Sequence, residues 1–168
     1  MTSKSERILL PRIEKSGCFA CGTDNPKGLG MSFYAVGKTV RSDISLSKHH
    51  MGWENLAHGG IISTILDEIM GWTVIAFRRG FFVTRKMEVH YLRPVELHAP
   101  LTVVGEIESD FSLKGCSTKG ALLDAQGKKL AEAWAEMRYL SGKRLPMLPE
   151  HYRKGMLELF ERMRELLD

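Results

Sequence analysis

The stretch Leu56–Trp72 constrains the fold of this chain most, because it joins a glycine pair to a long apolar run that carries a carboxylate. At about 100° per residue, a helix over this stretch has one broad apolar face and one narrow face of small residues. We expect the helix to continue to about Phe77 and to form the core. The apolar face contains Ile62, Ile65, Ile69, Trp72 and Ala76, and the narrow face contains Gly60, Ser63, Thr64, Gly71 and Val74 around Asp67.

Asp67 on the narrow face needs a hydrogen-bonding partner or a functional role, because burying an unpaired charge costs free energy. Gly59 and Gly60 begin the helix, where unpaired N–H groups and the helix dipole favour negative charge. Asp67 follows two turns later on the same side as Gly60. A donor near a base suits acyl transfer, with Asp67 or a water that it holds as the attacking group. The alternative is a structural acid that Ser63 or Thr64 caps.

Length and charge exclude several classes of protein. The chain has 168 residues, which is enough for one domain with a core. No apolar run reaches the ~18 residues of a membrane span, and Met1–Arg7 lacks the apolar segment of a secretory signal. We therefore expect a cytoplasmic protein without a membrane partner. The net charge of +4 is spread along the chain, which argues against a nucleic-acid partner and suits a phosphorylated small molecule.

Three cysteines are present, and Cys18 and Cys21 have the spacing of a metal or redox pair. An odd number of cysteines in a cytoplasmic chain argues against a disulfide framework. A zinc site needs about four ligands, and the sequence contains no second cysteine pair. We therefore predict a structural turn at Cys18–Cys21, no metal site and no cofactor.

The pattern along the chain predicts an α+β protein with one domain over residues 1–168. Alternating polarity and turn residues indicate strands, and a C-terminal apolar stripe indicates a helix. Pro146 and Pro149 separate this helix from the core. The expected parts are an arm at 1–16, a core at 17–141 with a turn-rich loop at 17–30, strands at 29–36, 39–46, 81–95, 101–111, 114–124 and 129–140, and a C-terminal segment at 146–168 with a helix over 151–167.

The motif Asn55-x-x-His58-Gly59-Gly60, with Asp67 seven residues after Gly60, resembles the hotdog-fold acyl-CoA thioesterases of the phenylacetate-pathway (PaaI-like) and THEM-like branch. The resemblance covers about residues 17–141. Two further segments also look like that group: Cys18-Phe19-Ala20-Cys21-Gly22 with Asn25-Pro26 and Gly28-Leu29, and Thr84 with Tyr91-x-Arg93-Pro94.

The resemblance implies a six-stranded antiparallel sheet wrapped around the helix, in homodimers or homotetramers with active sites at the dimer interface. It implies hydrolysis of an acyl-CoA or aryl-CoA thioester without a metal. Asp67 would be the general base or nucleophile, the Gly60 N–H would polarise the carbonyl, and His58 would orient the loop or the thioester. Thr84 would reach the site from the partner subunit and position the attacking water.

Several residues carry weaker assignments. Thr84 lies in phase with Lys86 and Glu88 on the more polar face of its strand, so it can equally be an ordinary strand residue. Glu68 is a second candidate acid, although a rim or ion-pair role suits it better. The predicted substrate-binding residues are Asn55, Gly59, Glu68, Arg85, Lys86 and Arg93, the last three for the phosphates of CoA.

Two alternative functions remain open at this point. Some family members carry an asparagine six residues before the histidine, where this chain has Gly52, and this difference suits a non-catalytic acyl-CoA-binding dimer. The other alternative is a hotdog enoyl-CoA hydratase or dehydratase, which the position of Asp67 fits less well.

Overall fold

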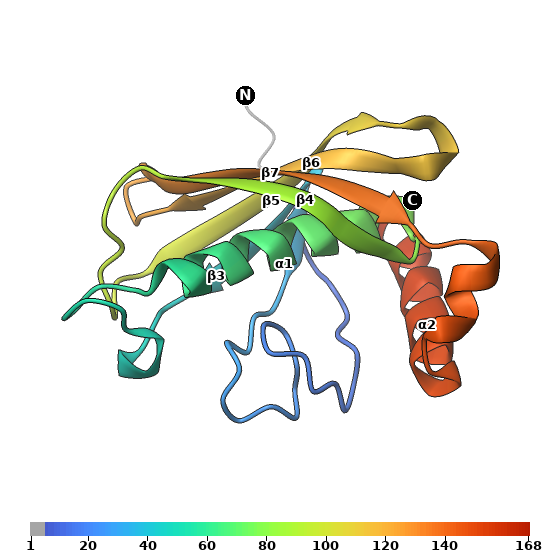
Figure 1. The fold of residues 1–168 in the computed structure, drawn as a ribbon, viewed down its shortest axis with the longest axis horizontal. Coiled ribbons are helices and arrows are strands. Elements are labelled where there is room, and N and C mark those ends of the chain that lie inside the picture. The colour runs from blue at the N-terminus through green and yellow to red at the C-terminus, as the bar shows by residue number, and fades with distance from the viewer. Residues whose placement is uncertain (1–5) are drawn as a thin grey trace.

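One antiparallel sheet curves over a long helix, α1, in the computed structural model, which describes residues 6–168 (Figure 1). The strand order is β1-β2-β3-β5-β6-β7-β4, so β1 and β4 form the two edges. The strands are β1 (Arg7–Leu9), β2 (Tyr34–Val36), β3 (Thr39–Ile44), β4 (Phe82–Tyr91), β5 (Leu101–Asp110), β6 (Gly115–Leu123) and β7 (Lys129–Tyr139), and the helices are α1 (Gly59–Arg78) and α2 (Glu150–Leu167). This is the predicted hotdog architecture with an additional C-terminal helix.

The sheet has one strand more than predicted, because part of the N-terminal arm pairs with β2. Ile8 lies opposite Ala35 in this antiparallel pair. Residues 1–5 of the predicted arm lie outside the described residues. The first predicted strand, 29–36, is regular only over Tyr34–Val36, although Met31 and Phe33 before it are buried in the core.

Helix α1 begins and ends with recognisable caps. The His58 side chain accepts a hydrogen bond from the Gly60 N–H at the first turn. At the other end Arg79 has the left-handed conformation, with φ of 49°, and its N–H donates to the Val74 carbonyl. The helix therefore covers the predicted range to within one residue.

Small residues on the sheet let α1 approach its inner face closely. A Cβ atom on Gly105 of β5 would lie 2.5 Å from Thr73 Oγ1 and 2.8 Å from the Ile69 carbonyl oxygen. Gly120 of β6 meets Met70 in the same way, and the alanines at 131, 133 and 135 of β7 are buried. The sheet and the helix thus share one core with little space between their backbones.

A bulge in β4 changes which side chains face the helix. The register with β7 shifts between Thr84 and Lys86, so Arg85 is the extra residue. Directly opposed residues share a face, and Thr84 lies opposite Met137 while Met87 lies opposite Ala135. Thr84 therefore faces the core side together with Met87, and the predicted phase of Thr84 with Lys86 and Glu88 is wrong.

Helix α2 packs against the end of α1 and the start of β4. Its buried side chains are Met156, Leu159, Phe160 and Met163. The Phe160 ring meets the Phe81 ring edge-on, with centroids 5.4 Å apart. Arg79 at the end of α1 forms an ion pair with Asp168, which follows α2. The C-terminal segment is thus attached to the core at two places, next to the start of β4 and at the end of α1.

Within the described part of the chain, one helix has the length and composition to cross a membrane, and this is α1. The sheet covers much of its surface: 61% of its most apolar 18-residue window is buried in the fold. Its hydrophobicity therefore has a sufficient explanation in the core.

We expect Gly105→Ala to lower the free energy of unfolding by about 1–3 kcal/mol, because the new methyl group overlaps backbone and hydroxyl atoms of α1. Gly155→Ala is the matched control, because Gly155 lies inside α2 and a Cβ added there would have nothing within 4 Å. This control is expected to be neutral or to stabilise by up to about 1 kcal/mol through helix propensity. Denaturant titrations measure both. Equal effects of the two substitutions would contradict the close packing described for Gly105.

Candidate active site

An aspartate and a threonine form the centre of the candidate site. Thr84 Oγ1 donates a hydrogen bond to Asp67 Oδ1 at 2.8 Å and also lies 3.5 Å from Met137 Sδ. Asp67 comes from the third turn of α1 and Thr84 from the start of β4, so the bulge in β4 is needed for this contact. Both residues belong to one chain, which corrects the expectation that Thr84 reaches the acid from a partner subunit.

The N-terminus of α1 presents a different set of donors. The Gly60 N–H, which was expected to polarise the carbonyl, donates to His58 Nδ1 at 2.9 Å. His58 therefore acts as the helix cap, and the Gly60 N–H already has an acceptor. The Gly59 N–H precedes it and makes no backbone hydrogen bond among the described residues. Gly59 is thus the better placed of the two glycines to bind an external oxygen.

The helix N-terminus and Asp67 lie too far apart to act on one carbonyl group within a single chain. Seven residues separate Gly60 from Asp67, and a helix rises about 1.5 Å per residue, which gives roughly 10 Å. The expectation that Asp67 lies near the donor at the start of its own helix is therefore wrong. Donor and acid can meet at one substrate only if they come from two copies of the chain.

Tyr91 is an additional polar residue at the helix N-terminus. Its hydroxyl donates to the Gly59 carbonyl at 3.1 Å and lies 2.6 Å from Ser63 Oγ. The ring carbons lie 3.6 Å from where a Cβ on Gly59 would stand. Tyr91 thus fixes the first turn of α1 against the end of β4. In the sequence it appeared only within the motif before Arg93 and Pro94.

Glu68 points away from this pair and meets the cysteine turn. The Trp72 indole N–H donates to Glu68 Oε1 at 2.9 Å, and Cys18 Sγ lies 3.9 Å from each oxygen of the carboxylate. Burial is the main reason that the pKa of Glu68 is raised to about 7, and the neighbouring Cys18 adds to this effect. Glu68 is therefore not a rim residue on the solvent side of the helix.

The two cysteines of the turn differ in acidity. A hydrogen bond from Cys21 lowers the pKa of Cys18 to about 5, and the backbone N–H groups of Ala20, Cys21 and Gly22 act in the same direction. The pKa of Cys21 is raised, because its thiol is held in this hydrogen bond and is shielded from water. These surroundings therefore favour the thiolate form of Cys18 over that of Cys21.

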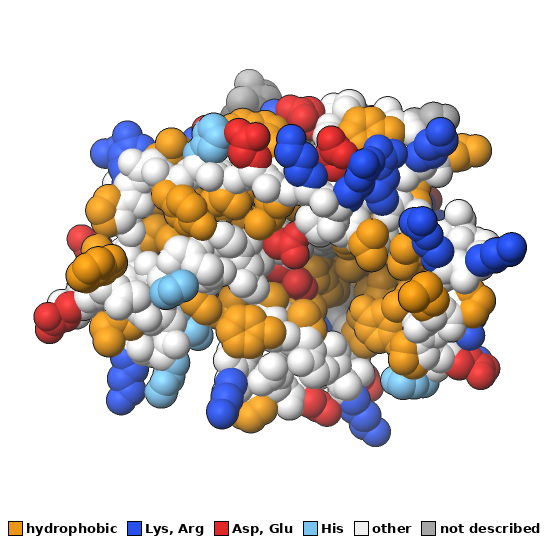
Figure 2. Space-filling view, in the orientation of Figure 1, with side chains coloured by type: hydrophobic (Ala, Val, Ile, Leu, Met, Phe, Trp, Pro, Cys, Tyr) orange, Lys and Arg blue, Asp and Glu red, His pale blue; other side chains and the backbone are white. Residues whose placement is uncertain are grey.

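A cavity of about 240 Å³ opens between α1, the start of β4, the cysteine turn and α2. Aromatic and aliphatic side chains line most of it, and Glu68 and the two cysteines lie in its wall. Figure 2 shows this hollow to the right of centre, with hydrophobic side chains around it and acidic side chains at its edge. Glu68 and Val83, which are the chain neighbours of Asp67 and Thr84, line it, whereas Asp67 and Thr84 themselves do not.

The remaining predicted binding residues do not form one cluster. Arg85 and Lys86 are exposed at the bulge, close to Thr84 in the chain. Arg93 lies about seven strand residues further, roughly 23 Å away along the strand, and donates to the Lys129 carbonyl at 2.6 Å. Asn55 has a left-handed backbone, with φ of 62°, and its carbonyl accepts a hydrogen bond from the Leu97 N–H. No single phosphate can touch Arg93 and the bulge together.

The comparisons with known proteins agree with this fold. Residues 54–109, which include the helix N-terminus, Asp67 and Thr84, match the family model of the thioesterase superfamily. The chain therefore has the hotdog fold of that superfamily and carries its signature over α1, β4 and most of β5. No curated protein sequence matches the chain.

Solved structures of thioesterase superfamily proteins resemble it over most of its length. One such protein superposes with a TM-score of 0.67 at 22% identity, and the match covers 74% of this chain and 60% of the other. This chain thus spans less than two thirds of that protein. The Escherichia coli PaaI protein, from the phenylacetic acid degradation operon, gives a TM-score of 0.61 at 15% identity, with 68% and 82% covered.

A third structure contains a ligand. The Streptococcus mutans protein smu.793, bound to acetyl-CoA, superposes with a TM-score of 0.59 at 23% identity, and the match covers 68% of this chain and 90% of that protein. At these identities the likeness establishes the fold.

Proposed function

We propose that this protein is an acyl-CoA thioesterase that hydrolyses a thioester to a free acid and CoA. The observation that carries the proposal is the Asp67 carboxylate, which accepts a hydrogen bond from Thr84 and is the chain neighbour of Glu68 in the wall of an apolar cavity. The acetyl-CoA bound to a similar fold supports the choice of a CoA ester. We also propose that the protein acts in the cytoplasm and that the hydrolysis itself uses no cofactor.

The geometry favours Asp67 as a general base. Thr84 occupies one carboxylate oxygen, so the other can accept a proton from a water molecule. The water oxygen attacks the thioester carbon, and the carbonyl oxygen takes up the negative charge at a helix N-terminal N–H. The C–S bond then breaks, and the CoA sulfur leaves with the proton that Asp67 received. We assign the N–H donor to Gly59 in place of Gly60.

The donor has to come from a second copy of the chain. Strand β4 is a ten-residue edge strand with exposed apolar side chains at Val83 and Tyr91, and the exposed Leu92 follows directly after it. Such an edge favours pairing with another strand. If two β4 strands pair across a two-fold axis, the α1 helices beneath them run antiparallel. The N-terminus of each helix then approaches the middle of the other, where Asp67 lies. We therefore propose a homodimer, alone or within a tetramer.

The cavity supports an acyl group of limited size. An apolar cavity of 150 Å³ in another protein is known to bind benzene, so about 240 Å³ can hold a phenyl ring or a short to medium aliphatic chain. Arg85 and Lys86 lie outside the cavity at the bulge, and we assign them to the phosphates of CoA.

One observation favours the alternative of a non-catalytic acyl-CoA-binding dimer. A Cβ on Gly52 would lie 2.9 Å from the His58 Cα atom, so no larger side chain fits there without movement. The carbonyl contact that an asparagine makes at this position in some family members is therefore missing. Tight binding of acyl-CoA without turnover would select this alternative.

We expect Asp67→Asn to lower kcat by about 10²- to 10⁴-fold on the best substrate of an acyl-CoA panel, because the base is lost. Thr84→Val keeps the shape and loses the hydrogen bond to a charged group, so a loss of roughly 10- to 100-fold is expected. Thiol release measures both. Asp110→Asn is the control, because this exposed acid pairs with Arg78 outside the site and its loss leaves turnover unchanged.

The shared site is tested with hybrid dimers. Gly59→Pro removes the N–H at the first helical position, where proline is tolerated, so the fold is preserved. A purified hybrid of one Asp67→Asn subunit and one Gly59→Pro subunit contains one site with both defects and one intact site. We expect about half of the wild-type kcat from it, although each parent dimer is nearly inactive. An inactive hybrid would show that both groups act from one chain.

The assignment of the acyl group to the cavity has its own test. Val83→Phe places a larger ring at the cavity wall. We expect kcat/KM to fall about 10-fold or more for phenylacetyl-CoA, because the cavity then no longer accommodates several carbon atoms of its ring, and one methylene alone changes kcat/KM by at least about 10-fold. We expect kcat/KM to change little for acetyl-CoA. The acetyl-CoA rate is the internal control for folding. An equal loss on both substrates would place the acyl group elsewhere.

A further inference from the structure

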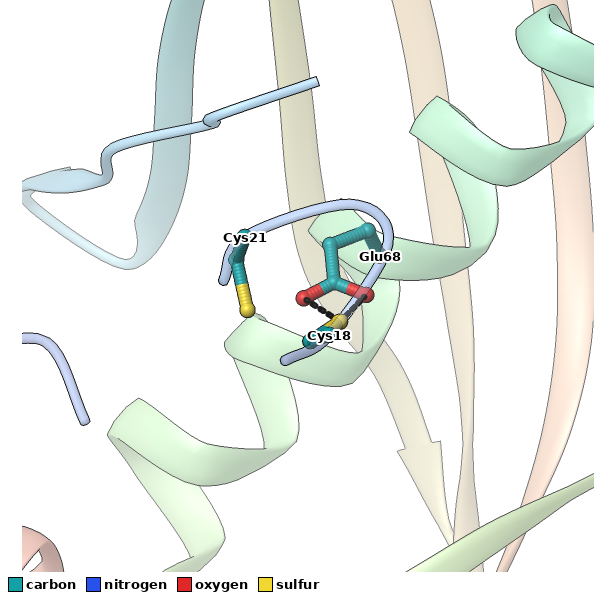
Figure 3. Close-up of side chains that lie close together, drawn as sticks. All are labelled: Cys18, Cys21 and Glu68. Atoms are coloured by element: carbon teal, nitrogen blue, oxygen red, sulfur yellow. Dashed lines mark hydrogen bonds between the residues drawn. The ribbon is translucent and has the colours of Figure 1, made fainter. Parts of the chain in front are cut away.

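The cysteine turn and Glu68 bring three metal-binding side chains together. Cys18 and Cys21 come from the loop before β2, and Glu68 comes from α1, fifty residues later in the chain than Cys18. Figure 3 shows the two sulfur atoms and the carboxylate pointing toward one another. One ligand atom from each residue lies within 4.8 Å of the other two. These groups lie in the wall of the acyl cavity, but the hydrolysis proposed at Asp67 uses none of them.

The turn is shaped before any ligand binds. The Gly22 N–H donates to the Cys18 carbonyl at 2.9 Å. A Cβ on Gly22 would lie 2.4 Å from the carbonyl oxygens of Ser16 and Cys18, so the tight turn requires glycine at this position. The turn therefore fixes the loop that carries both sulfur atoms, and the thiolate is the form of cysteine that binds metals.

The rest of the loop holds the turn against α1. The Leu29 N–H donates to the Phe19 carbonyl at 2.8 Å, and the Met31 N–H donates to the Ala20 carbonyl at 2.9 Å. Both acceptors lie between the two cysteines. The cysteines are therefore fixed in place relative to Glu68, whose other partner is the Trp72 indole.

The Glu68 carboxylate forms no ion pair with any residue that the structure describes. Among residues 6–168, no lysine, arginine or histidine nitrogen lies within 4.0 Å of the Glu68 carboxylate, which is partly buried. Arg12 comes near the turn, but its guanidinium donates to the Cys21 carbonyl oxygen. Two sulfurs and a carboxylate that lie together without a cation are a favourable site for a divalent ion.

We propose that Cys18, Cys21 and Glu68 bind one zinc ion in each chain. A tetrahedral zinc site with Zn–S bonds of about 2.3 Å and Zn–O bonds of about 2.0 Å has ligand–ligand distances of roughly 3.5–3.8 Å. The present separations of 3.9 Å to at most 4.8 Å need to shrink by roughly 1.3 Å at most. Sulfur with carboxylate ligands selects zinc over magnesium or calcium, which prefer oxygen alone.

The fourth position of the zinc ion faces the cavity, because all three ligands lie in the cavity wall. Three protein ligands and an open position are typical of zinc sites that bind water or an incoming group. The ion also connects the N-terminal loop to α1. The proposal does not depend on the thioesterase activity, since Asp67 points to Thr84 and Glu68 points to the turn.

The test measures metal binding to the full chain. We expect elemental analysis of protein purified with a non-chelating reductant to find one zinc per chain. After removal of the metal with a chelator, titration with Co²⁺ should give the visible bands of a tetrahedral site and a thiolate-to-cobalt charge-transfer band. Zinc added afterwards should abolish both signals at a ratio of one per chain.

Substitutions distinguish this site from adventitious binding. Cys18→Ser, Cys21→Ser and Glu68→Gln should each weaken Co²⁺ binding by more than about 10-fold. Replacing a residue that only hydrogen-bonds to a metal ligand already lowers metal affinity about 10-fold, so the loss of a ligand should lower it further. Cys116→Ser is the control, because Cys116 is buried elsewhere and should leave the stoichiometry and the spectrum unchanged. Thermal melts of the metal-free proteins establish that the variants are folded.

Two results would overturn the proposal. One is a folded wild-type chain that gives no tetrahedral cobalt spectrum, including a chain in which Cys18 and Cys21 form a disulfide under the reducing conditions. The other is a spectrum that Glu68→Gln and Cys21→Ser leave unchanged. Because the readout is metal content, a chain without thioesterase activity can still confirm the zinc site.

Discussion

The close contact between α1 and the sheet is the constraint on which the rest of the structure depends. Gly105 and Gly120 carry no side chain where the helix passes, so Thr73 and Met70 fill that space. At this distance from the sheet, the narrow face of α1, which carries Asp67, lies against the edge strand β4. The Asp67–Thr84 contact follows directly, because both partners belong to elements whose separation the core already determines.

Local patterns predicted the helix and the positions of most strands along the chain well. The glycine pair, the apolar face and the capping histidine lie within one stretch of sequence, and their spacing depends only on helix geometry. The position of Thr84 was harder to predict. Alternation along a strand assumes a regular pleat, and the extra residue Arg85 breaks it. A sequence pattern carries no sign of such a bulge, so Thr84 was assigned to the polar face.

The cysteine turn illustrates the same limit at long range. Counting ligands in the sequence found two at Cys18 and Cys21, and this number argued against a metal. The third candidate ligand, Glu68, is fifty residues away from Cys18 and next to an acid with a different task. Only the packing of the N-terminal loop on α1 brings it to the turn. Glu68 was predicted to lie on the rim because the sequence gives its position on the helix but does not show that the N-terminal loop packs over it.

The bulge at Arg85 shifts the alternation of side chains along β4 by one residue. Before it, Phe82 and Thr84 face the helix, and after it Met87 and Val89 do, so odd and even positions exchange roles within one strand. The site residue Thr84 and the core residues Met87 and Val89 therefore lie in separate halves of β4. A one-residue insertion or deletion in the first half turns Thr84 away from Asp67. The second half of the strand still packs against the core. A binding protein without turnover can arise from such a scaffold by a single inserted or deleted residue.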